Sequence, residues 1–333
     1  MARVKGIQAH KLFKLGKAPA KKDTRTLQFA TLLRAAAPEL PTASDFDTLK
    51  GSDYARRAVS SGQERGIHNP RIRGEDRMAK AKGIQAHKLF KLGTAPAKKD
   101  KRTLQFATLL RAAAPALPTA YDFDTTHAGI PTPMFANDVH GDCVIAGRAH
   151  QTLRFEDIEQ GSVLMITDKE VLKEYFKETG GPDTGLVVLD SLNRWRHTGW
   201  KVGKHTYRIH AFAEVNFRNH DEVRQAIFAD VGVGLGVQLP NAAKGQIQTG
   251  QPWDVTTGPD ATPGSWGGHY IYVPGYTPSG PVCVTWGRKQ QMTWAWLDKY
   301  CDEAYAIFDA KNRFKKALID QAKIAAFLRT LTQ

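Results

Sequence analysis

The chain has 333 residues, of which 41% are hydrophobic and 9% aromatic. This is enough for one large or two ordinary domains with a buried core, and it excludes a wholly disordered protein. Three cysteines, with no Cys-x-x-Cys spacing, exclude a disulfide scaffold and predict no metal site. The net charge of +14 lies entirely in residues 1–125, with 25 Lys/Arg and 11 Asp/Glu, whereas residues 126–333 hold 22 of each.

The basic N-terminal arm has two possible roles. It can bind polyanions through counterion release, or its lysines simply solvate a poorly packed segment. The arm has neither interleaved aromatic residues nor a groove-reading motif, so sequence-specific nucleic-acid binding is not expected. Arg34 interrupts its only apolar run, and the longest later run, 231–240, is about half a bilayer span. We therefore expect a cytoplasmic protein without membrane contact.

A long repeat dominates the N-terminal part of the chain. Residues 5–48 recur at 82–125 with only four differences in 44 positions. Solenoid folds need at least three stacked units, so two near-identical copies indicate a recent duplication. We predict a first copy at 1–48, a linker at 49–81, a second copy at 82–125 that packs on a globular part at 126–310, and a C-terminal helix at 311–333. The first copy is expected to be peripheral.

The predicted elements begin inside the second copy. Apolar spacing from Leu104 to Leu110 predicts a short amphipathic helix that ends before Pro115. A second helix is predicted from Cys143 to about Phe155, after the loop PTPMFANDVHGD (131–142). The rest of the predicted elements are helices at 167–180 (with a Thr167/Glu170 capping box) and 186–199, a strand at 204–215, a helix at 220–230, a buried strand at 231–239, two antiparallel strands within 267–287, a short helix and then a strand within 291–309, and a helix within 310–331. Helices first and an antiparallel sheet afterwards predict an α+β fold.

Cys143 and His269 are the candidate reactive pair. A thiol attacks a carbonyl only as the thiolate, and a helix N-terminus together with a nearby histidine lowers the pKa of a thiol. Cys143 stands at a predicted helix start, and His269 follows two glycines on a predicted strand 126 residues later. These glycines would let a substrate backbone approach closely. The alternative is that Cys143 is a small buried core residue.

From about residue 130 to 309 the sequence resembles the papain-like cysteine peptidases. Similar segments occur in the same order: Asn137 followed by HGDCVIA (140–146), DSLNRWRHTGW (190–200), VRQAIFADVGVGLGVQ (223–238), GGHYIYVPGY (267–276) and VTWG (284–287). The wider pattern, with KLGKAPA and YCDEA, resembles proteins of bacteria and their phages. The resemblance implies a papain-like α+β fold, with a helical half, an antiparallel sheet half and a cleft between them.

The resemblance also implies roles for individual residues. Cys143 would be the nucleophile and His269 the base and acid, with Gly268 beside it, and the side-chain amide of Asn137 would join an oxyanion hole. Trp286 would shield the catalytic hydrogen bond. Val284 stands where the family has the asparagine that orients the histidine, and strand alternation predicts that the nearest polar residue, Thr285, points to the opposite face. His140 stands where the family has a half-cystine.

The leading hypothesis is a cofactor-free cysteine hydrolase that cleaves a peptide or other amide bond through an acyl-enzyme. A Cys–His dyad, or a ring oriented by a backbone carbonyl, would compensate for Val284. The alternative is a non-catalytic papain-fold protein that binds a partner or belongs to a phage particle. A phage-encoded chain would act in the host cytoplasm or in the virion. The substrate and the oligomeric state cannot be read from the sequence.

Overall fold

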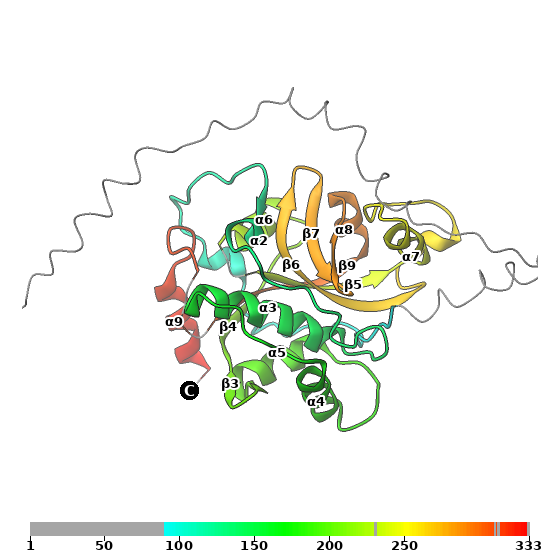
Figure 1. Cartoon of the computed structure of the whole chain (residues 1–333). Helices are drawn as coiled ribbons and strands as arrows, with labels where there is room; N and C mark the ends of the chain where they lie inside the picture. The colour runs from blue at the N-terminus through cyan, green and yellow to red at the C-terminus, as the bar shows by residue number, and fades with distance from the viewer. Residues whose placement is uncertain (1–89, 230–231, 310, 312–313, 332–333) are drawn as a thin grey trace, which may run out of the picture. The chain divides into compact units, whose positions relative to one another are not determined.

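The computed structural model describes residues 90–229, 232–309, 311 and 314–331 (Figure 1). The predicted first copy (1–48), the linker (49–81) and residues 82–89 of the second copy lie outside the described residues. The polyanion contact proposed for the arm, the domain boundaries and the cytoplasmic location therefore stay predictions.

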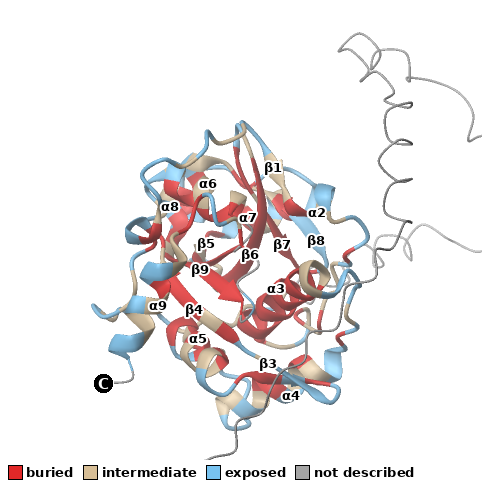
Figure 2. Cartoon of the chain, turned by 90° about the vertical axis from the view of Figure 1, so that its left-hand side faces the viewer, coloured by how far each residue is buried: buried red, intermediate tan, exposed pale blue. Residues whose placement is uncertain are grey.

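One antiparallel sheet forms the centre of the described structure. Its strands follow the order β4-β9-β5-β6-β7-β8, and β1 pairs with the C-terminal end of β6. The bounds are β1 Tyr121–Asp122, β4 Ile209–Glu214, β5 Val233–Leu239, β6 Gly267–Thr277, β7 Gly280–Thr285, β8 Arg288–Gln291 and β9 Cys301–Asp309. Figure 2 shows that β6 and the strands beside it are buried over most of their length. The central strands are therefore protected on both faces.

Two glycines of β5 lie against large side chains of the neighbouring strands. A β-carbon added at Gly234 would lie 1.8 Å from the hydroxyl oxygen of Tyr270 on the neighbouring strand β6. A β-carbon at Gly236 would lie 2.5 Å from the Glu303 side chain on β9. The two glycines leave room for large side chains of β6 and β9, which flank β5 in the sheet.

Three helices and a small hairpin form the other half of the described structure, and Figure 1 shows these helices grouped on one side of β5 and β6. Their bounds are α3 Cys143–Gln160, α4 Asp168–Thr179, α5 Val188–His197, β2 Trp200–Val202 and β3 His205–Tyr207. The predicted capping box is present, because Thr167 and Glu170 bond each other's backbone N–H. This half and the sheet have separate hydrophobic cores. The α+β class predicted from the order of elements is confirmed.

Helix α3 is buried around almost its whole circumference, so its polar side chains need partners inside the protein. Arg148 forms an ion pair of 2.9 Å with Glu178, and both side chains are only 3% exposed. Arg154 forms a bidentate ion pair with Asp124, with two nitrogen–oxygen distances of 2.6 and 2.8 Å. These paired charges fix the rotation of α3 and thereby the direction in which its first residue points.

The remaining described helices cover the sheet and its edges. They are α2 Phe123–Thr126, α6 His220–Phe228, α7 Asn241–Gln248, α8 Trp294–Tyr300, α9 Gln321–Thr330 and the 3-10 turns η3 Phe106–Leu109 and η4 Pro259–Ala261. The predicted strand at 204–215 is divided, because β3 pairs with β2 while β4 joins the large sheet. The C-terminal helix is shorter than predicted.

The described part of the second copy packs along the globular part. Phe106 and Leu109 are fully buried in the sheet core, and Gln105 bridges to Glu214 of β4. The amphipathic helix predicted between Leu104 and Leu110 is only the single 3-10 turn η3. The helix stops there because Leu110 pairs with Ile319 as an isolated bridge and adopts an extended backbone.

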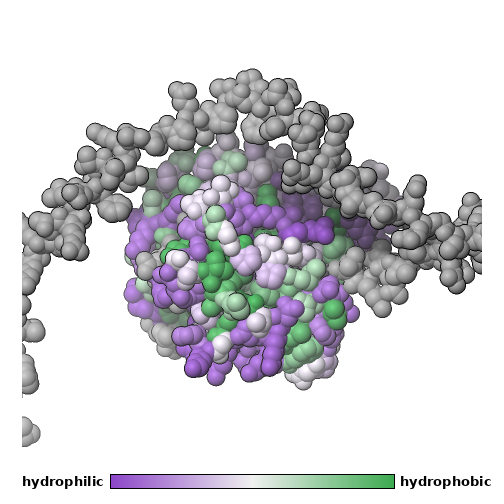
Figure 3. All heavy atoms as spheres, viewed as in Figure 1, coloured by the Kyte–Doolittle hydropathy of each residue, from purple (hydrophilic) through white to green (hydrophobic). Residues whose placement is uncertain are grey.

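Among the described residues no helix is both long enough and apolar enough to span a bilayer. On the face seen in Figure 3, hydrophilic residues dominate the rim and apolar residues form smaller patches within it. Among the residues that the structure describes, few large apolar side chains are exposed, and Met165 at 82% is the most exposed of these. Scattered exposed apolar side chains of this kind are normal for a protein surface.

The duplication provides a matched test of which copy packs. We expect Phe106→Ala to destabilise the protein by about 3–5 kcal/mol, because it opens a cavity in the sheet core. The same change in the first copy, Phe29→Ala, is expected to leave stability unchanged. Urea unfolding followed by circular dichroism measures both. Equal losses in the two variants, or no loss from Phe106→Ala, would contradict the predicted packing of the second copy.

Candidate active site

Cys143 is the first residue of α3, as the sequence predicts, and is 1% exposed. Burial raises the pKa of its thiol to about 12, and hydrogen bonds from the backbone N–H groups of Tyr270, Gly93 and Val144 act in the opposite direction. The N–H of Val144 belongs to the free first turn of the helix, which favours a negative charge at this sulfur. The bond from Tyr270 brings the thiol to the residue that directly follows His269.

The approach of α3 to β6 depends on Gly147. A β-carbon at this position would lie 2.5 Å from the Tyr270 ring, so any larger residue would push the helix away from the strand. Gly147 lies one helical turn after Cys143. The absence of a side chain at Gly147 therefore allows the N-terminal part of α3 to lie close to β6.

His269 lies on β6, is 1% exposed and has a pKa lowered by burial to about 3. Its Nε2 lies 2.8 Å from the Thr285 hydroxyl oxygen, and its Nδ1 has no hydrogen-bond partner among the described residues. The indole of Trp286 stacks on the imidazole with ring centroids 4.1 Å apart and planes inclined by 9°. The imidazole is therefore fixed by a hydrogen bond at Nε2 and by the stacked indole, and its Nδ1 makes no hydrogen bond to the described residues.

The expectation that Thr285 points away from His269 is wrong. Val284 pairs with Tyr272, so continuing the register places Thr285 opposite Ile271. Side chains two residues apart share a face of a strand, and Ile271 therefore shares its face with His269. Thr285 lies diagonally across from the imidazole and bonds it. Val284 lies on the other face, so its lack of a polar group does not affect the ring.

Trp286 adopts an unusual backbone conformation that aims its ring. Its φ is +43°, and Gly287 has φ +70°, so the two form a tight turn between Thr285 and Arg288. A positive φ is strained for a bulky residue and marks sites where function outweighs local energy. The strain at Trp286 is consistent with the shielding role that the resemblance implies.

Asn137 is buried in the loop before α3, and its amide is already in use. Its Nδ2 donates to the His140 carbonyl at 3.1 Å and to Asp142 Oδ1 at 2.9 Å. Both amide hydrogens are thereby engaged within the loop. A role in an oxyanion hole stays a prediction, and it requires Asn137 to exchange one of these partners.

Residues 91–95 cross the site as an extended segment. The N–H of Lys91 bonds the Asn137 carbonyl at 3.1 Å, and the Trp286 indole donates to the Lys91 carbonyl at 3.2 Å. The N–H of Thr94 bonds the Gly268 carbonyl at 3.3 Å. Gly268, expected to permit close approach of a backbone, therefore does so for the chain's own segment. This segment explains why Cys143 and His269 are so deeply buried.

The site in this conformation holds a neutral thiol and a neutral imidazole, since the pKa of Cys143 is raised and that of His269 is lowered. Both shifts have the same cause, the exclusion of water. Removing the segment would readmit water, lower the pKa of the thiol and raise that of the imidazole.

Comparisons with protein-family models and with curated proteins give no match. Among solved structures, xylellain, a cysteine protease from Xylella fastidiosa, matches with a TM-score of 0.52 at 16% identity. The match covers 67% of this chain and 97% of that one. The chain has the papain-like fold. The TM-score is 0.47 for proCathepsin B S9 from Trypanosoma congolense (12% identity, covering 70% of this chain and 96% of that one) and 0.45 for the protease CMS1MS2 from Carica candamarcensis (14%, 58% and 99%).

The papain-like fold expected from the sequence, with a helical and a sheet half, is thus confirmed. Sequence reasoning missed the segment at 91–95 and the buried acid Asp142. The repeat was a visible signal for the segment, because the described copy conserves Phe-Lys-Leu-Gly at 90–93 from residues 13–16. No sequence signal distinguishes a buried aspartate from an ordinary helix N-cap.

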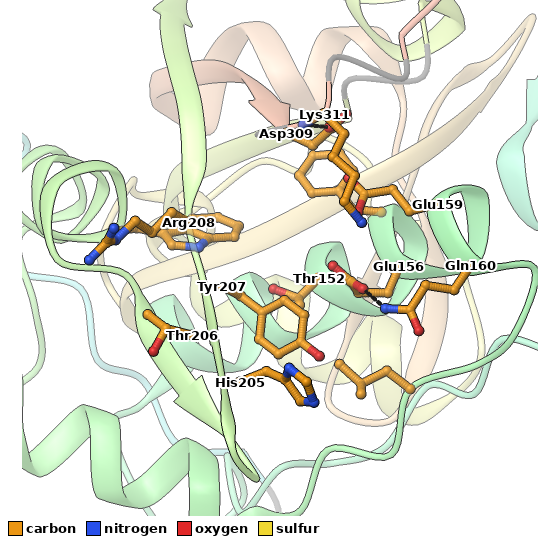
Figure 4. Close-up of a pocket in the computed structure, with 13 residues that line it drawn as sticks. Thr152, Glu156, Glu159, Gln160, His205, Thr206, Tyr207, Arg208, Asp309 and Lys311 are labelled. Atoms are coloured by element: carbon orange, nitrogen blue, oxygen red, sulfur yellow. Dashed lines mark hydrogen bonds and ion pairs between the residues drawn. The ribbon is translucent and has the colours of Figure 1, made fainter. Parts of the chain in front are cut away.

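A separate pocket of 360 Å³ lies at the opposite end of α3 from Cys143 (Figure 4). Figure 4 shows Glu156 bonded to Gln160 on α3, and Lys311, next to the end of β9, paired with Glu159. Among the described residues, no group of three or more His, Cys, Asp or Glu is arranged to hold a metal ion. The pocket contains no residue of the papain-like site.

Asp142 gives the site a pH signature that stability measurements can detect. Burial, with a smaller contribution from neighbouring Asp183 and Asp168, raises its pKa to about 8 against the opposing effect of the Asn137 bond. The folded state therefore binds a proton that the unfolded state loses above its pKa of about 4, so this group's contribution to stability falls as pH rises from about 4 to 8.

We expect Asp142→Asn to remove that dependence. The difference in melting temperature between variant and native protein should increase in favour of the variant by several degrees from pH 4 to pH 8. Differential scanning fluorimetry at pH 4, 6 and 8 measures it, and Asp138→Asn in the same loop controls for the loss of one carboxyl. A difference that stays constant or falls with pH would contradict a buried, protonated Asp142.

Proposed function

We propose that this protein is a cysteine hydrolase that cleaves a peptide or other amide bond, with Cys143 as nucleophile and His269 as general base and acid. One observation carries the proposal: the thiol at the start of α3 accepts a bond from the N–H of the residue that follows His269. This contact between distant parts of the chain supports the pairing of the Cys143 thiol with the His269 imidazole. The likeness to xylellain, whose structure is described as that of a cysteine protease, supports the same reaction class.

The hydrogen bond to Thr285 is compatible with the imidazole tautomer that the reaction requires. When Nε2 carries the hydrogen and donates it to Thr285 Oγ1, Nδ1 has a free lone pair that can accept the thiol proton. Thr285 is therefore a positioning residue, in the place that Val284 cannot fill. The stacked indole of Trp286 keeps water from the ring and restricts its rotation.

The reaction follows from these positions. The Cys143 proton passes to Nδ1 of His269, and the thiolate attacks the carbonyl carbon of the amide. The amine leaves with the proton that His269 returns to it, and a thioester remains on the sulfur. His269 then takes a proton from water as the oxygen attacks the thioester carbon, and it returns that proton to the departing sulfur, which releases the carboxylic acid and restores the thiol.

Stabilisation of the oxyanion would come from the start of α3. The N–H of Cys143 lies in the first turn, where backbone donors have no partner within the helix. The Asn137 amide would be the second donor after releasing the Asp142 carboxyl or the His140 carbonyl. A single such donor is typically worth ~3 kcal/mol in the transition state.

The described conformation is a covered, resting form of this site. The Gly93 N–H, rather than a carbonyl carbon, faces the sulfur, so the crossing segment is not presented for attack. The raised pKa of the thiol keeps it protonated at neutral pH. Activity therefore requires that residues 91–95 leave the site.

A non-catalytic peptide-binding protein is the second candidate. The engagement of both Asn137 amide hydrogens favours it, because an oxyanion donor that is already bonded contributes nothing to catalysis. This candidate predicts that the cleft binds peptides but that the thiol gains no reactivity from His269.

Alkylation with iodoacetamide distinguishes the two candidates. Gly93→Arg places a side chain where no room exists and is expected to dislodge the segment, so that Cys143 is alkylated selectively at pH 7. Burial raises the pKa of Cys283 and Cys301, which serve as internal controls. Peptide mass spectrometry of the alkylated protein gives each rate. Equal labelling of all three cysteines, or labelling of Cys143 that His269→Ala leaves unchanged, would contradict the hydrolase.

Turnover tests the positioning role of Thr285. In the Gly93→Arg background, we expect Thr285→Val to lower kcat for a fluorescent casein by about tenfold, the equivalent of ~1.4 kcal/mol for one lost hydrogen bond, while Thr285→Ser retains activity. His269→Ala should cost about 10²- to 10⁴-fold. Full activity of Thr285→Val would show that another group orients the ring.

A further inference from the structure

The crossing segment is held beside the thiol in a slot formed by two loops. One wall is Gly141, which precedes α3, and the other is Gly185, which precedes α5. The Gly93 carbonyl accepts a bond from the Leu186 N–H at 2.9 Å, and Thr94 pairs with Leu186 as a parallel bridge. A backbone that enters this slot is therefore recognised in the extended form.

The slot has no space for a side chain on the residue next to the thiol. A β-carbon added to Gly93 would lie 1.7 Å from the Gly141 oxygen, 2.2 Å from its carbonyl carbon and 2.5 Å from its Cα. All three are backbone atoms, which cannot turn aside as a flexible side chain can. Even alanine would force the segment or the wall to move.

The walls themselves are made of glycines that let the segment come close. A β-carbon at Gly185 would lie 2.4 Å from the Gly93 oxygen, and one at Gly268 would lie 2.4 Å from the Thr94 hydroxyl oxygen. A β-carbon at Gly267 would lie 2.8 Å from the Leu92 side chain. Close packing therefore requires glycine on both sides, at Gly93 of the segment and at Gly185 and Gly268 of the walls.

A hydrogen-bond chain through Asp183, whose side chain is 30% exposed, and the buried Tyr175 fixes the width of the slot. The Gly141 N–H donates to Asp183 Oδ1 at 2.9 Å, the Tyr175 hydroxyl donates to the same oxygen at 2.6 Å, and the Gly185 N–H donates to the Tyr175 hydroxyl oxygen at 2.9 Å. Asp183 and Tyr175 thereby tie one wall to the other. Tyr175 is fully buried, so this brace cannot shift without disturbing the core of the helical half.

We propose that this braced slot makes the cleft selective for extended peptides with glycine at the position next to the thiol and leucine immediately before it. Leucine fits the preceding position because Leu92 packs against Gly267 and the sheet core. The inference rests on the peptide-binding cleft of the proposed function but does not depend on hydrolysis. Asp183 and Tyr175 are positioning residues for this selectivity.

The first test is protection of Cys143 from iodoacetamide in the full chain. Gly93→Ala is expected to raise the alkylation rate of Cys143 about tenfold or more over the native protein. Gly245→Ala is the matched control, because a β-carbon there meets nothing within 4 Å. Protection of Cys143 in Gly93→Ala equal to that in the native protein would overturn the proposal.

The second test supplies the ligand as a separate peptide. In the Gly93→Ala protein, the peptide FKLGTAPAKK, which has the sequence of residues 90–99, should restore protection at a concentration at least about tenfold lower than FKLATAPAKK. Fluorescence anisotropy of the labelled peptides reports binding even if Cys143 is never alkylated. Tight binding of FKLGTAPAKK without alkylation would support the slot while contradicting the hydrolase, and equal binding of the two peptides would overturn the slot.

The third test loosens the brace. Tyr175→Phe removes the hydroxyl that joins the walls and keeps the ring that fills the core, so it should bring the Gly/Ala selectivity of the two peptides close to one. Tyr300→Phe is the matched control, since its buried hydroxyl bonds the Ala261 carbonyl at 2.8 Å and takes no part in the brace. A selectivity ratio that Tyr175→Phe leaves as large as in Tyr300→Phe would show that the brace does not set it.

Discussion

The contact between the start of α3 and strand β6 is the constraint on which the site depends. Gly147 allows the helix to lie directly on the Tyr270 ring, and one turn earlier the Cys143 sulfur reaches the Tyr270 N–H. Burial of most of α3, with its arginines paired inside the protein, holds the helix in that position. A larger residue at this contact would move the thiol away from the strand that carries His269, 126 residues later in the sequence.

The two sides of the site are stabilised in different ways. The thiol depends on the position of a helix, whereas the imidazole depends on a strand register and a strained turn. The same register that hides Val284 on the far face brings Thr285 to the imidazole, and the turn at Trp286 lays an indole on the ring. Both groups are then sealed by the chain's own segment. This seal, rather than the intrinsic chemistry of either residue, accounts for the raised pKa of the thiol and the lowered pKa of the imidazole.

Much of this architecture could be predicted from local sequence. The capping box at Thr167 and the continuous apolar run of β5 are local sequence patterns, so both elements are predicted close to their true bounds. The orientation of Thr285 could not be predicted in this way. It follows from the pairing of β7 with β6, which the resemblance of VTWG to a family motif does not reveal. The covering segment was equally hidden: its sequence is visible twice, but only the fold shows that Gly93 reaches the thiol.

The most direct test of this account is chemical cross-linking with 1,3-dibromoacetone, whose two reactive carbons can join a thiol to a nearby imidazole. In the Gly93→Arg protein, peptide mass spectrometry should find one major cross-link, between Cys143 and His269. Cys143 alkylated at one end only, or joined to a different residue, would show that the two side chains do not meet and would contradict the account.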